Sequence, residues 1–333
     1  MNFNSLSEIA SYIVSDGKGI LAADESNPTC TKRFDSIGVE STEENRRDYR
    51  ELLFRSEGMK GNIGGVILFD ETIRQTAVDG TPLVDIITSQ GSLPGIKVDK
   101  GLQQIDDTEE SLTQGLEGLD SRLKEYYGLG AKFTKWRAVI NISDNLPTQH
   151  AININSYLLA LYASLSQEVG LVPIVEPEVL MDGDHSIDRC SEVTDITLNK
   201  VFQHLDESNV FLPGIVLKPN MVLSGKDASN RADSSKVADY TIEVLSNNVP
   251  NEVPGVAFLS GGQEDQESID NLNSINLAAK SKKSPWELTY SYGRGLQAAP
   301  LRIWDGKNEN VVKAQDEFEK RGIAASKARQ GIY

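Results

Sequence analysis

The sequence is short of cysteine, histidine and positive charge, and each shortage excludes a class of site or partner. Its 333 residues include two cysteines, Cys30 and Cys190, which are too few for a disulfide framework or a cysteine-based zinc site. We interpret both as reduced thiols. The 33 Lys and Arg residues against 49 Asp and Glu residues give a formal charge of −16. This balance argues against nucleic-acid or membrane-surface partners, because both require surplus cations.

Long apolar runs are also missing. No stretch approaches the roughly 18 apolar residues that span a membrane. The first residues, MNFNSLSEIASYIVSDGKG, lack the basic and apolar regions of a secretion signal and are more typical of a short amphipathic helix. We therefore expect a cytoplasmic protein.

Eight short apolar runs are present instead, rich in β-branched residues and bounded by turn residues. They begin at Gly19, Ile63, Pro94, Phe133, Leu171, Pro213, Pro254 and Leu288. Their continuous apolar character is typical of strands buried on both faces of a parallel sheet. Helical patterns lie between them, at 45–58, 109–127, 153–169, 186–207, 234–247, 264–280 and 308–329, where apolar residues recur at helical spacing.

This alternation predicts an α/β protein with a single (β/α)8 TIM barrel. The barrel domain would span 1–333, with 306–333 forming a C-terminal helix and a shortened tail. A doubly wound sheet is the alternative. Against it, no GxGxxG motif follows an early strand, as a dinucleotide-binding sheet would require.

Charged and small polar residues stand where these strands end. They are Asp24-Glu25, Asp70-Glu71, Asp99-Lys100, Lys135 with Arg137, Glu176 with Glu178, Lys218, Ser260-Gly261-Gly262, and Ser291 with Gly293-Arg294. In a TIM barrel the carboxyl ends of the strands form one mouth, where the chemistry takes place. Because buried charges need partners, we expect these groups to converge. The alternative is a set of separate charges that each reach solvent.

Lys218 is the candidate nucleophile. It follows the apolar run GIVL and precedes Pro219, so burial and the nearby cation Lys135 are expected to favour the neutral amine that a Schiff base needs. A phosphate ligand and a salt-bridge partner are commoner roles for such a lysine. Glu176 and Glu178 share one face of their strand. As close carboxylates they would leave one ionised and one protonated group for acid/base work, with metal binding as the rival interpretation.

No metal or other cofactor is expected. We place His150 in a loop, His185 in a helix-entry turn and His204 near a helix end, and the three follow no ligand spacing. An oxygen-only Mg²⁺ site formed by Asp24, Glu176 and Glu178 is the alternative, although the interleaved lysines compete for those carboxylates.

Two segments favour phosphate binding. Ser260-Gly261-Gly262 and Gly293-Arg294 follow the last two strands, where barrels commonly hold phosphate with backbone N–H groups and a basic side chain. Basic pairs at 32–33 and 46–47 are candidates for a second phosphate. Solvated helix charges are the other interpretation of these two pairs.

The segments that carry these residues resemble the class I, metal-independent fructose-1,6-bisphosphate aldolases. They read GKGILAADES, GGVILFDET, GIKVDKGL, KWRAVINI, VPIVEPEVLMDGDH, LKPNMV, FLSGGQ and SYGRGLQA, in order from about Gly17 to Tyr333. The resemblance implies an aldehyde-lyase that reversibly cleaves fructose 1,6-bisphosphate to dihydroxyacetone phosphate and glyceraldehyde 3-phosphate. It further implies a role in glycolysis, gluconeogenesis or a sugar-phosphate cycle, and a homotetramer.

The resemblance also implies residue roles. Lys218 would form the Schiff base, Glu176 would be the general acid/base, and Glu178 would position the lysines. Asp24 would assist proton transfer at the C4 hydroxyl, and Lys100, Lys135 and Arg137 would hold charge and hydroxyls. The C1 phosphate would bind Ser260, Gly261, Gly262, Gly293 and Arg294, and the C6 phosphate would approach Ser26, Thr29 and Arg33, with Arg46 a weaker candidate.

Two segments depart from the family pattern. Family members continue past a GxY sequence into a tail whose terminal tyrosine enters the site, and Tyr333 aligns with the start of that tail. Pro28 also stiffens what we expect to be a loop near the distal phosphate. A different class of function, a barrel that serves as a binding scaffold, is the alternative hypothesis. Sedoheptulose bisphosphate and fructose 1-phosphate are alternative substrates.

Overall fold

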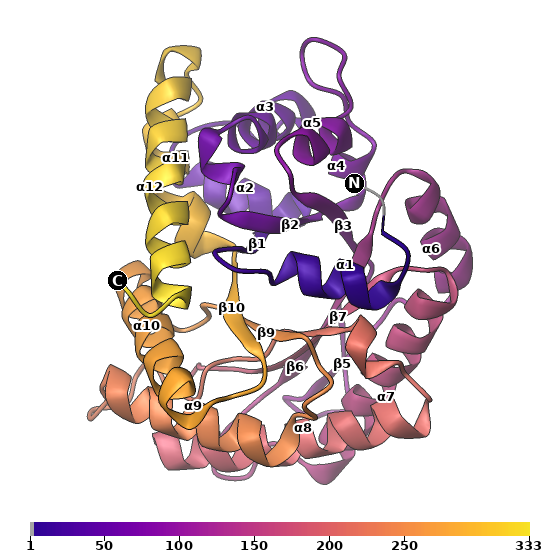
Figure 1. Ribbon diagram of the computed structural model, residues 1–333, viewed down its shortest axis with the longest axis vertical. Coiled ribbons are helices and arrows are strands. Elements are labelled where there is room, and N and C mark those ends of the chain that lie inside the picture. The colour runs from indigo at the N-terminus through magenta and orange to yellow at the C-terminus, as the bar shows by residue number, and fades with distance from the viewer. Residues whose placement is uncertain (1–2) are drawn as a thin grey trace.

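The fold is a closed barrel of eight parallel strands. The computed structural model describes residues 3–333, and its strands follow the order β1-β2-β3-β6-β7-β8-β9-β10 around the barrel (Figure 1). The strands are β1 (Gly19–Ala23), β2 (Ile63–Leu68), β3 (Leu93–Lys97), β6 (Phe133–Ile140), β7 (Val172–Val179), β8 (Val216–Leu217), β9 (Gly255–Phe258) and β10 (Glu287–Tyr292). Each corresponds to one of the eight predicted runs, so the predicted TIM barrel is confirmed.

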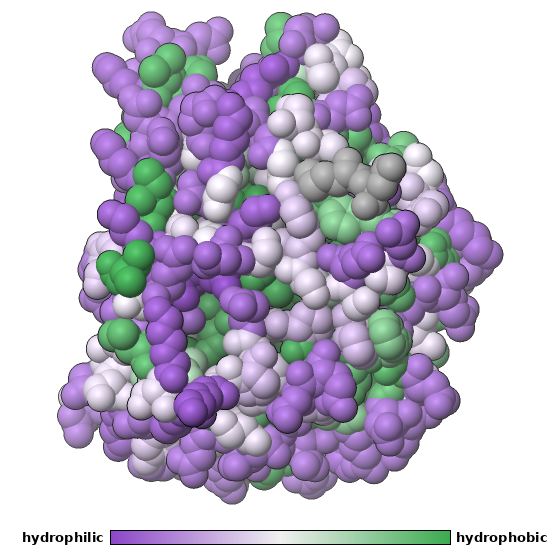
Figure 2. Space-filling model, viewed as in Figure 1, coloured by the Kyte–Doolittle hydropathy of each residue, from purple (hydrophilic) through white to green (hydrophobic). Residues whose placement is uncertain are grey.

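Helices surround the barrel and cover its outer face (Figure 1). They are α1 (Leu6–Ile13), α2 (Asn27–Asp35), α3 (Glu43–Phe54), α4 (Asp70–Ile73), α5 (Leu83–Ser89), α6 (Leu119–Gly128), α7 (Gln149–Glu168), α8 (Ile187–Glu207), α9 (Ser234–Asn248), α10 (Asp265–Lys282), α11 (Arg294–Trp304) and α12 (Val311–Arg329). The long helix α12 packs along α11 and α10. The surface of these outer helices is mostly hydrophilic on the face that Figure 2 shows.

Helix α1 closes the amino-terminal end of the barrel. Its buried residues Ile9 and Ile13 pack with inward-facing side chains of seven strands, among them Phe133 and Ile174. Close approach requires glycine in the neighbouring strand, because a Cβ on Gly64 would lie 2.1 Å from the carbonyl oxygen of Ile13. With this end filled by apolar side chains, polar groups can gather only at the opposite, carboxyl end.

The predicted helix at 109–127 is wrong in its first half. Residues 102–113 form the antiparallel hairpin β4 (Leu102–Gln104) and β5 (Ser111–Thr113), and α6 begins only at Leu119. Gly115 and Gly118 have φ of +129° and +65°, which interrupts a helix. The hydroxyl of Thr113 donates to the backbone oxygen of Arg137 on β6, and the amide of Asn155 on α7 donates to the backbone oxygen of Ser111. These bonds hold the hairpin against the barrel and α7.

Two other local predictions are wrong. The segment after β1 is the short helix α2 and not a loop, and Pro28 stands in its first turn, where proline is tolerated. His150 lies in α7 rather than in a loop, because this helix begins at Gln149 instead of the predicted residue 153. Among the described residues 3–333, no helix is long and apolar enough to cross a membrane.

Candidate active site

Four charged side chains form a continuous row at the carboxyl end of the barrel. Lys135 Nζ, on β6, lies 3.0 Å from Asp24 Oδ2 and 2.9 Å from Glu176 Oε2. Glu176, on β7, also reaches Lys218, whose Nζ lies 2.9 Å from its Oε1. Asp24 and Lys218 directly follow β1 and β8. Four separate strands therefore deliver alternating negative and positive charges to one place.

The four side chains of the row need one another as partners, because a buried charge without an opposite charge beside it is unstable. The side chains of Lys135, Glu176 and Lys218 are only 4–5% exposed. Desolvation alone would raise the pKa of Glu176, but Lys135 and Lys218 outweigh it and hold that pKa below its usual value. Burial likewise opposes the charge of Lys135, yet Asp24 and Glu176 raise the pKa of this lysine. The pKa of Asp24 is well below normal because two lysines overcome its desolvation.

This geometry corrects one expectation about the charged groups. Glu176 and Glu178 were expected to share a proton, but Glu176 pairs with lysines while Glu178 pairs with Arg137 Nε. Each carboxylate therefore has a cation of its own at ion-pair distance. Lys218 Nζ lies 2.9 Å from a carboxylate oxygen of Glu176, so a base, and not only the cation Lys135, lies beside the amine.

Glu178 extends the row toward the segment after β9. A Cβ on Gly261 would lie 3.0 Å from Glu178 Oε1, so the carboxylate contacts the backbone of the Ser260-Gly261-Gly262 turn. Gly262 has φ of +73°, and a Cβ there would lie 2.2 Å from Met181. Gly262 is thus required by space and by backbone conformation, whereas a Cβ at Gly261 would only be tight against Glu178 and Leu259.

The two predicted phosphate segments are joined to each other. Gly293 is the N-cap of α11 and Arg294 is its first residue. The Arg294 guanidinium donates through Nη2 to the carbonyl oxygen of Gln263, at 2.9 Å, which ties this helix end to the Ser260-Gly261-Gly262 turn. Free backbone N–H groups at a helix start attract anions. The two segments therefore form one candidate anion site.

Ser26, Thr29 and Arg33 all belong to α2 or its N-cap. Ser26 is the N-cap residue, and its Oγ lies 3.2 Å from Thr29 Oγ1 instead of capping the helix. Arg33 lies close to the first residues of α11, although the two segments are far apart in the sequence. Its Nη2 is 3.8 Å from the position that a Cβ on Gly293 would take. These three residues therefore border the mouth on the side of β1.

Arg46 does not reach the mouth. It is bound to Glu71 by two hydrogen bonds, from Nε at 2.8 Å and Nη2 at 2.5 Å, and also donates to Ser41. Its side chain is 9% exposed. Asp70 and Glu71 likewise turn outward as the start of α4, where Asp70 accepts from Tyr126. These three charges brace helices rather than join the row.

Lys97 is a mouth residue that the sequence reasoning missed. It lies on β3, where it is paired with Lys135 in the sheet register, and its Nζ is 3.3 Å from Asp99 Oδ1. The sequence contains a signal for this residue: Lys97 precedes Asp99 by two positions, so the two side chains share one face of an extended strand. A cavity of about 620 Å³ beside the row is lined by Ser26, Lys97, Asp99 and the predicted Lys100.

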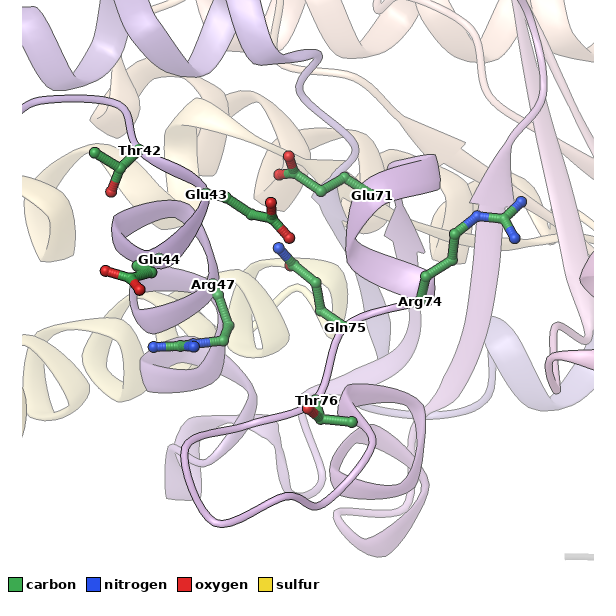
Figure 3. A pocket seen from close by; sticks show the side chains of 8 residues that line it. All are labelled: Thr42, Glu43, Glu44, Arg47, Glu71, Arg74, Gln75 and Thr76. Atoms are coloured by element: carbon green, nitrogen blue, oxygen red, sulfur yellow. The ribbon is translucent and has the colours of Figure 1, made fainter.

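A second cavity, of about 760 Å³, lies outside the mouth between α3 and α4. Figure 3 shows the Gln75 amide directed toward Glu43 and Glu71, and Arg74 directed away. Its other lining residues are Thr42, Glu44, Arg47 and Thr76. Unlike the 620 Å³ cavity, this one is lined by no residue of β3 or of the segment that follows it, so its size alone does not make it the candidate active site.

The remaining candidates lie apart from the row. Tyr333 rests on α10, with its hydroxyl 3.3 Å from Gln266 and its backbone N–H bonded to Asn273, so it lies outside the mouth. His204 contacts Asn153 and Glu207 on the outer helices. Within residues 3–333, no group of three or more His, Cys, Asp or Glu side chains is placed to hold a metal ion.

Comparison with known proteins gives matches over almost the whole chain. The family model described as glycolytic, fructose-bisphosphate aldolase class-I, matches residues 5–333. Fructose-bisphosphate aldolase 6, cytosolic, of Arabidopsis thaliana is 51% identical over 325 residues, covering 97% of this chain and 90% of its own. A probable fructose-bisphosphate aldolase class 1 of Xanthomonas axonopodis pv. citri is 49% identical, covering 98% of both chains.

A solved structure agrees with these matches. Fructose-bisphosphate aldolase from Plasmodium falciparum, in a ternary co-crystal with TRAP and a small-molecule inhibitor, superimposes with a TM-score of 0.96 at 49% sequence identity. The match covers 98% of this chain and 94% of that one.

Proposed function

The chain belongs to the family of class I fructose-bisphosphate aldolases, and we propose that it cleaves fructose 1,6-bisphosphate through a Schiff base on Lys218. The aldolase activity follows from identity near 50% over almost the full length. One observation carries the Schiff-base assignment: the buried Lys218 Nζ lies 2.9 Å from Glu176 Oε1, at the end of a fully paired row. This contact supports the assignment, because it supplies an acceptor for the proton that the lysine must lose.

The first steps use Lys218 and Glu176. Transfer of a proton from the ammonium to the carboxylate frees the amine, whose lone pair attacks the C2 carbonyl carbon of the substrate. The carbonyl electron pair moves to oxygen, which takes the proton from Glu176, and the positively charged nitrogen then gives one proton to the Glu176 carboxylate, which leaves a neutral carbinolamine. Glu176 passes this proton to the departing hydroxyl. Water leaves, and the nitrogen lone pair forms the iminium bond.

Cleavage then uses the opposite end of the row. Asp24, held ionised by Lys135, accepts the proton of the C4 hydroxyl. The C3–C4 bond breaks, and its electron pair moves into the enamine that the iminium stabilises. Glyceraldehyde 3-phosphate leaves first, and protonation of the enamine at C3 followed by hydrolysis releases dihydroxyacetone phosphate. Lys135 keeps both carboxylates charged between these steps.

The phosphates of the substrate would occupy the two ends of the mouth. The Ser260-Gly261-Gly262 turn with Gly293 and Arg294 supplies backbone N–H groups and a guanidinium for the C1 phosphate. Ser26, Thr29, Lys97 and Lys100 border the side near β1 and β3, where the C6 phosphate would lie. Arg137 and Glu178 close the wall between them.

Borohydride trapping tests the proposal directly. Incubation with dihydroxyacetone phosphate and borohydride should inactivate the enzyme and add a reduced adduct on Lys218, detected by peptide mass spectrometry. Lys218→Met should abolish trapping, whereas Lys226→Met, at an exposed surface pair, should not. Full activity after trapping, or loss of cleavage in EDTA, would contradict the Schiff-base mechanism. Comparing kcat/KM for fructose 1,6-bisphosphate, sedoheptulose 1,7-bisphosphate and fructose 1-phosphate would identify the preferred substrate.

We further propose a cytoplasmic homotetramer acting in sugar-phosphate metabolism. The similarity to aldolases named cytosolic supports the location, although another relative is named chloroplastic. Light scattering on the purified enzyme tests the assembly, and a mass of one or two chains would contradict it.

A further inference from the structure

Glu25 follows Asp24 in sequence but takes no part in the charged row. Its side chain is 9% exposed. One carboxylate oxygen, Oε1, accepts two hydrogen bonds, from Arg33 Nη1 at 2.5 Å and from Gln297 Nε2 at 2.9 Å. A buried carboxylate with a single committed oxygen thus connects the residue after β1 to helices α2 and α11.

Gln297 gives this carboxylate a fixed position. It is 2% exposed, and its amide also donates to the carbonyl oxygen of Ala22 at 2.6 Å. Its own backbone oxygen accepts from the buried Tyr49 hydroxyl at 2.8 Å. Since the amide is held at two points, Glu25 Oε1 is fixed relative to Gly293, the N-cap of α11, four residues upstream of Gln297.

Arg33 is held at one end and open at the other. Nη1 is committed to Glu25, whereas Nη2 would lie 3.8 Å from a Cβ on Gly293. The Arg33 side chain is 30% exposed, so a ligand can approach it. A guanidinium can bond a carboxylate with one edge and a phosphate with the other.

We propose that Glu25 is a positioning residue that holds Arg33 beside Gly293, ready to bind a phosphate at the amino end of α11. An unrestrained arginine side chain loses conformational entropy when it binds a ligand. The bond to Glu25 already restricts the Arg33 rotamers in the free protein, so less entropy is lost on phosphate binding. The inference rests on the proposed aldolase site, because Gly293 belongs there to the C1-phosphate segment. It places Arg33 at the C1 phosphate, whereas the family resemblance implies the C6 phosphate.

Because Glu25 is charged, the direction of the change in phosphate affinity on its replacement tests the proposal. A carboxylate near a phosphate repels it, so removal of that charge alone would tighten phosphate binding. Loss of positioning would weaken it. Glu25→Gln keeps the shape and an oxygen that can accept from Gln297, but loses the ion pair with Arg33. Asp35→Asn removes the same charge from the exposed end of α2, where Asp35 makes no ion pair in the described structure.

The experiment measures kcat and KM for fructose 1,6-bisphosphate and competitive inhibition by inorganic phosphate. For Glu25→Gln we expect KM and the phosphate inhibition constant to rise about tenfold, the effect of losing one charge-assisted hydrogen bond, with a smaller change in kcat. Asp35→Asn should leave both constants within about twofold or lower them slightly. Lower constants in Glu25→Gln would overturn the proposal.

Arg33 variants separate the inference from the function on which it rests. Arg33→Ala should raise both constants, and adding Glu25→Gln to it should raise them no further, because Glu25 acts through Arg33. Additive effects would overturn the positioning role but leave the proposed phosphate site intact. No effect of Arg33→Ala would refute the Arg33 assignment itself.

A second variant keeps the test usable if Glu25→Gln fails to fold. Arg33→Lys, on the partly exposed face of α2, keeps the charge but lacks the fork that spans Glu25 and phosphate. We expect it to lose most of the affinity that Arg33→Ala loses. Full affinity in Arg33→Lys would show that charge alone suffices, and would overturn the proposal.

Discussion

Replacement of Lys135 by methionine tests the charged row most sharply. Lys135 Nζ lies within 3.0 Å of both Asp24 and Glu176, and its side chain is 5% exposed. Methionine fills similar space without charge. Asp24 then has no ion-pair partner, and Glu176 has only Lys218. Removing one partner of a buried ion pair costs about 3–5 kcal/mol, because an uncompensated charge is left in the interior.

The expected change in melting temperature follows from chain length. With about 2.1 cal/mol/K per residue, the 333 residues give an unfolding entropy of roughly 0.7 kcal/mol/K, so 3–5 kcal/mol corresponds to roughly 4–7 °C. Lys124→Met is the control, since Lys124 and Asp120 are an exposed pair at 65% and 54%. Such a pair contributes about 0.3–0.5 kcal/mol, so its loss should lower Tm by less than about 1 °C.

The pH dependence supplies a second readout. The pKa values of Asp24 and Glu176 are lowered from 3.8 and 4.5, so their stabilisation is present above those values and is lost as pH falls through the lower folded pKa values. The raised pKa of Lys135 means that this lysine stays charged throughout that range. In the variant the carboxylates can take up protons, so the Tm difference should narrow from pH 7 toward about pH 4.5.

Circular dichroism at several pH values measures both effects. Equal Tm losses in Lys135→Met and Lys124→Met, or a Tm difference that widens on acidification, would refute the inference that Lys135 compensates two buried carboxylates.

Three further substitutions separate structural from binding roles. Arg46→Met should lower the free energy of unfolding by about 2–4 kcal/mol, because Glu71 loses its two close hydrogen bonds. The KM for fructose 1,6-bisphosphate should stay within about twofold, and a large change in KM would show that Arg46 contacts the substrate. Gly262→Ala should cost at least about 2 kcal/mol, because φ is +73° and the new Cβ would meet Met181 at 2.2 Å; thermal melting checks this, and a wild-type Tm would contradict it. Lys97→Met should raise KM for fructose 1,6-bisphosphate about tenfold in steady-state assays, and an unchanged KM would place Lys97 outside the substrate site.

Strand positions and the charges at their ends could be predicted from the sequence. A strand buried on both faces must be apolar along its length, so β1, β6 and β7 are visible as continuous runs. Parallel strands all end at one side of the barrel, and therefore Asp24 and Lys218, which directly follow β1 and β8, had to meet near one mouth. Lys135 is the third residue of β6 and reaches them from within its strand. Order along the chain was enough to assign these residues to a common site.

Short elements were not predictable in the same way. The β4–β5 hairpin and the short helices α2 and α4 bury little apolar surface of their own, so no hydrophobic period marks them. Tertiary bonds hold them instead, such as Thr113 to the Arg137 carbonyl and Asn27 to Glu71. Where packing is weak, long-range polar contacts decide the local structure, and these contacts join residues far apart in the chain.

The sequence by itself determined which charges the protein possesses, on which strand each lies, and that a barrel brings their ends together. Only the tertiary structure decided the partners. Glu176 binds two lysines rather than sharing a proton with Glu178, Arg46 is bound by Glu71, and Arg33 is held by Glu25 beside Gly293. Ion pairs depend on distances of a few ångströms and on exclusion of water, and strand order and register set both across separate segments of the chain.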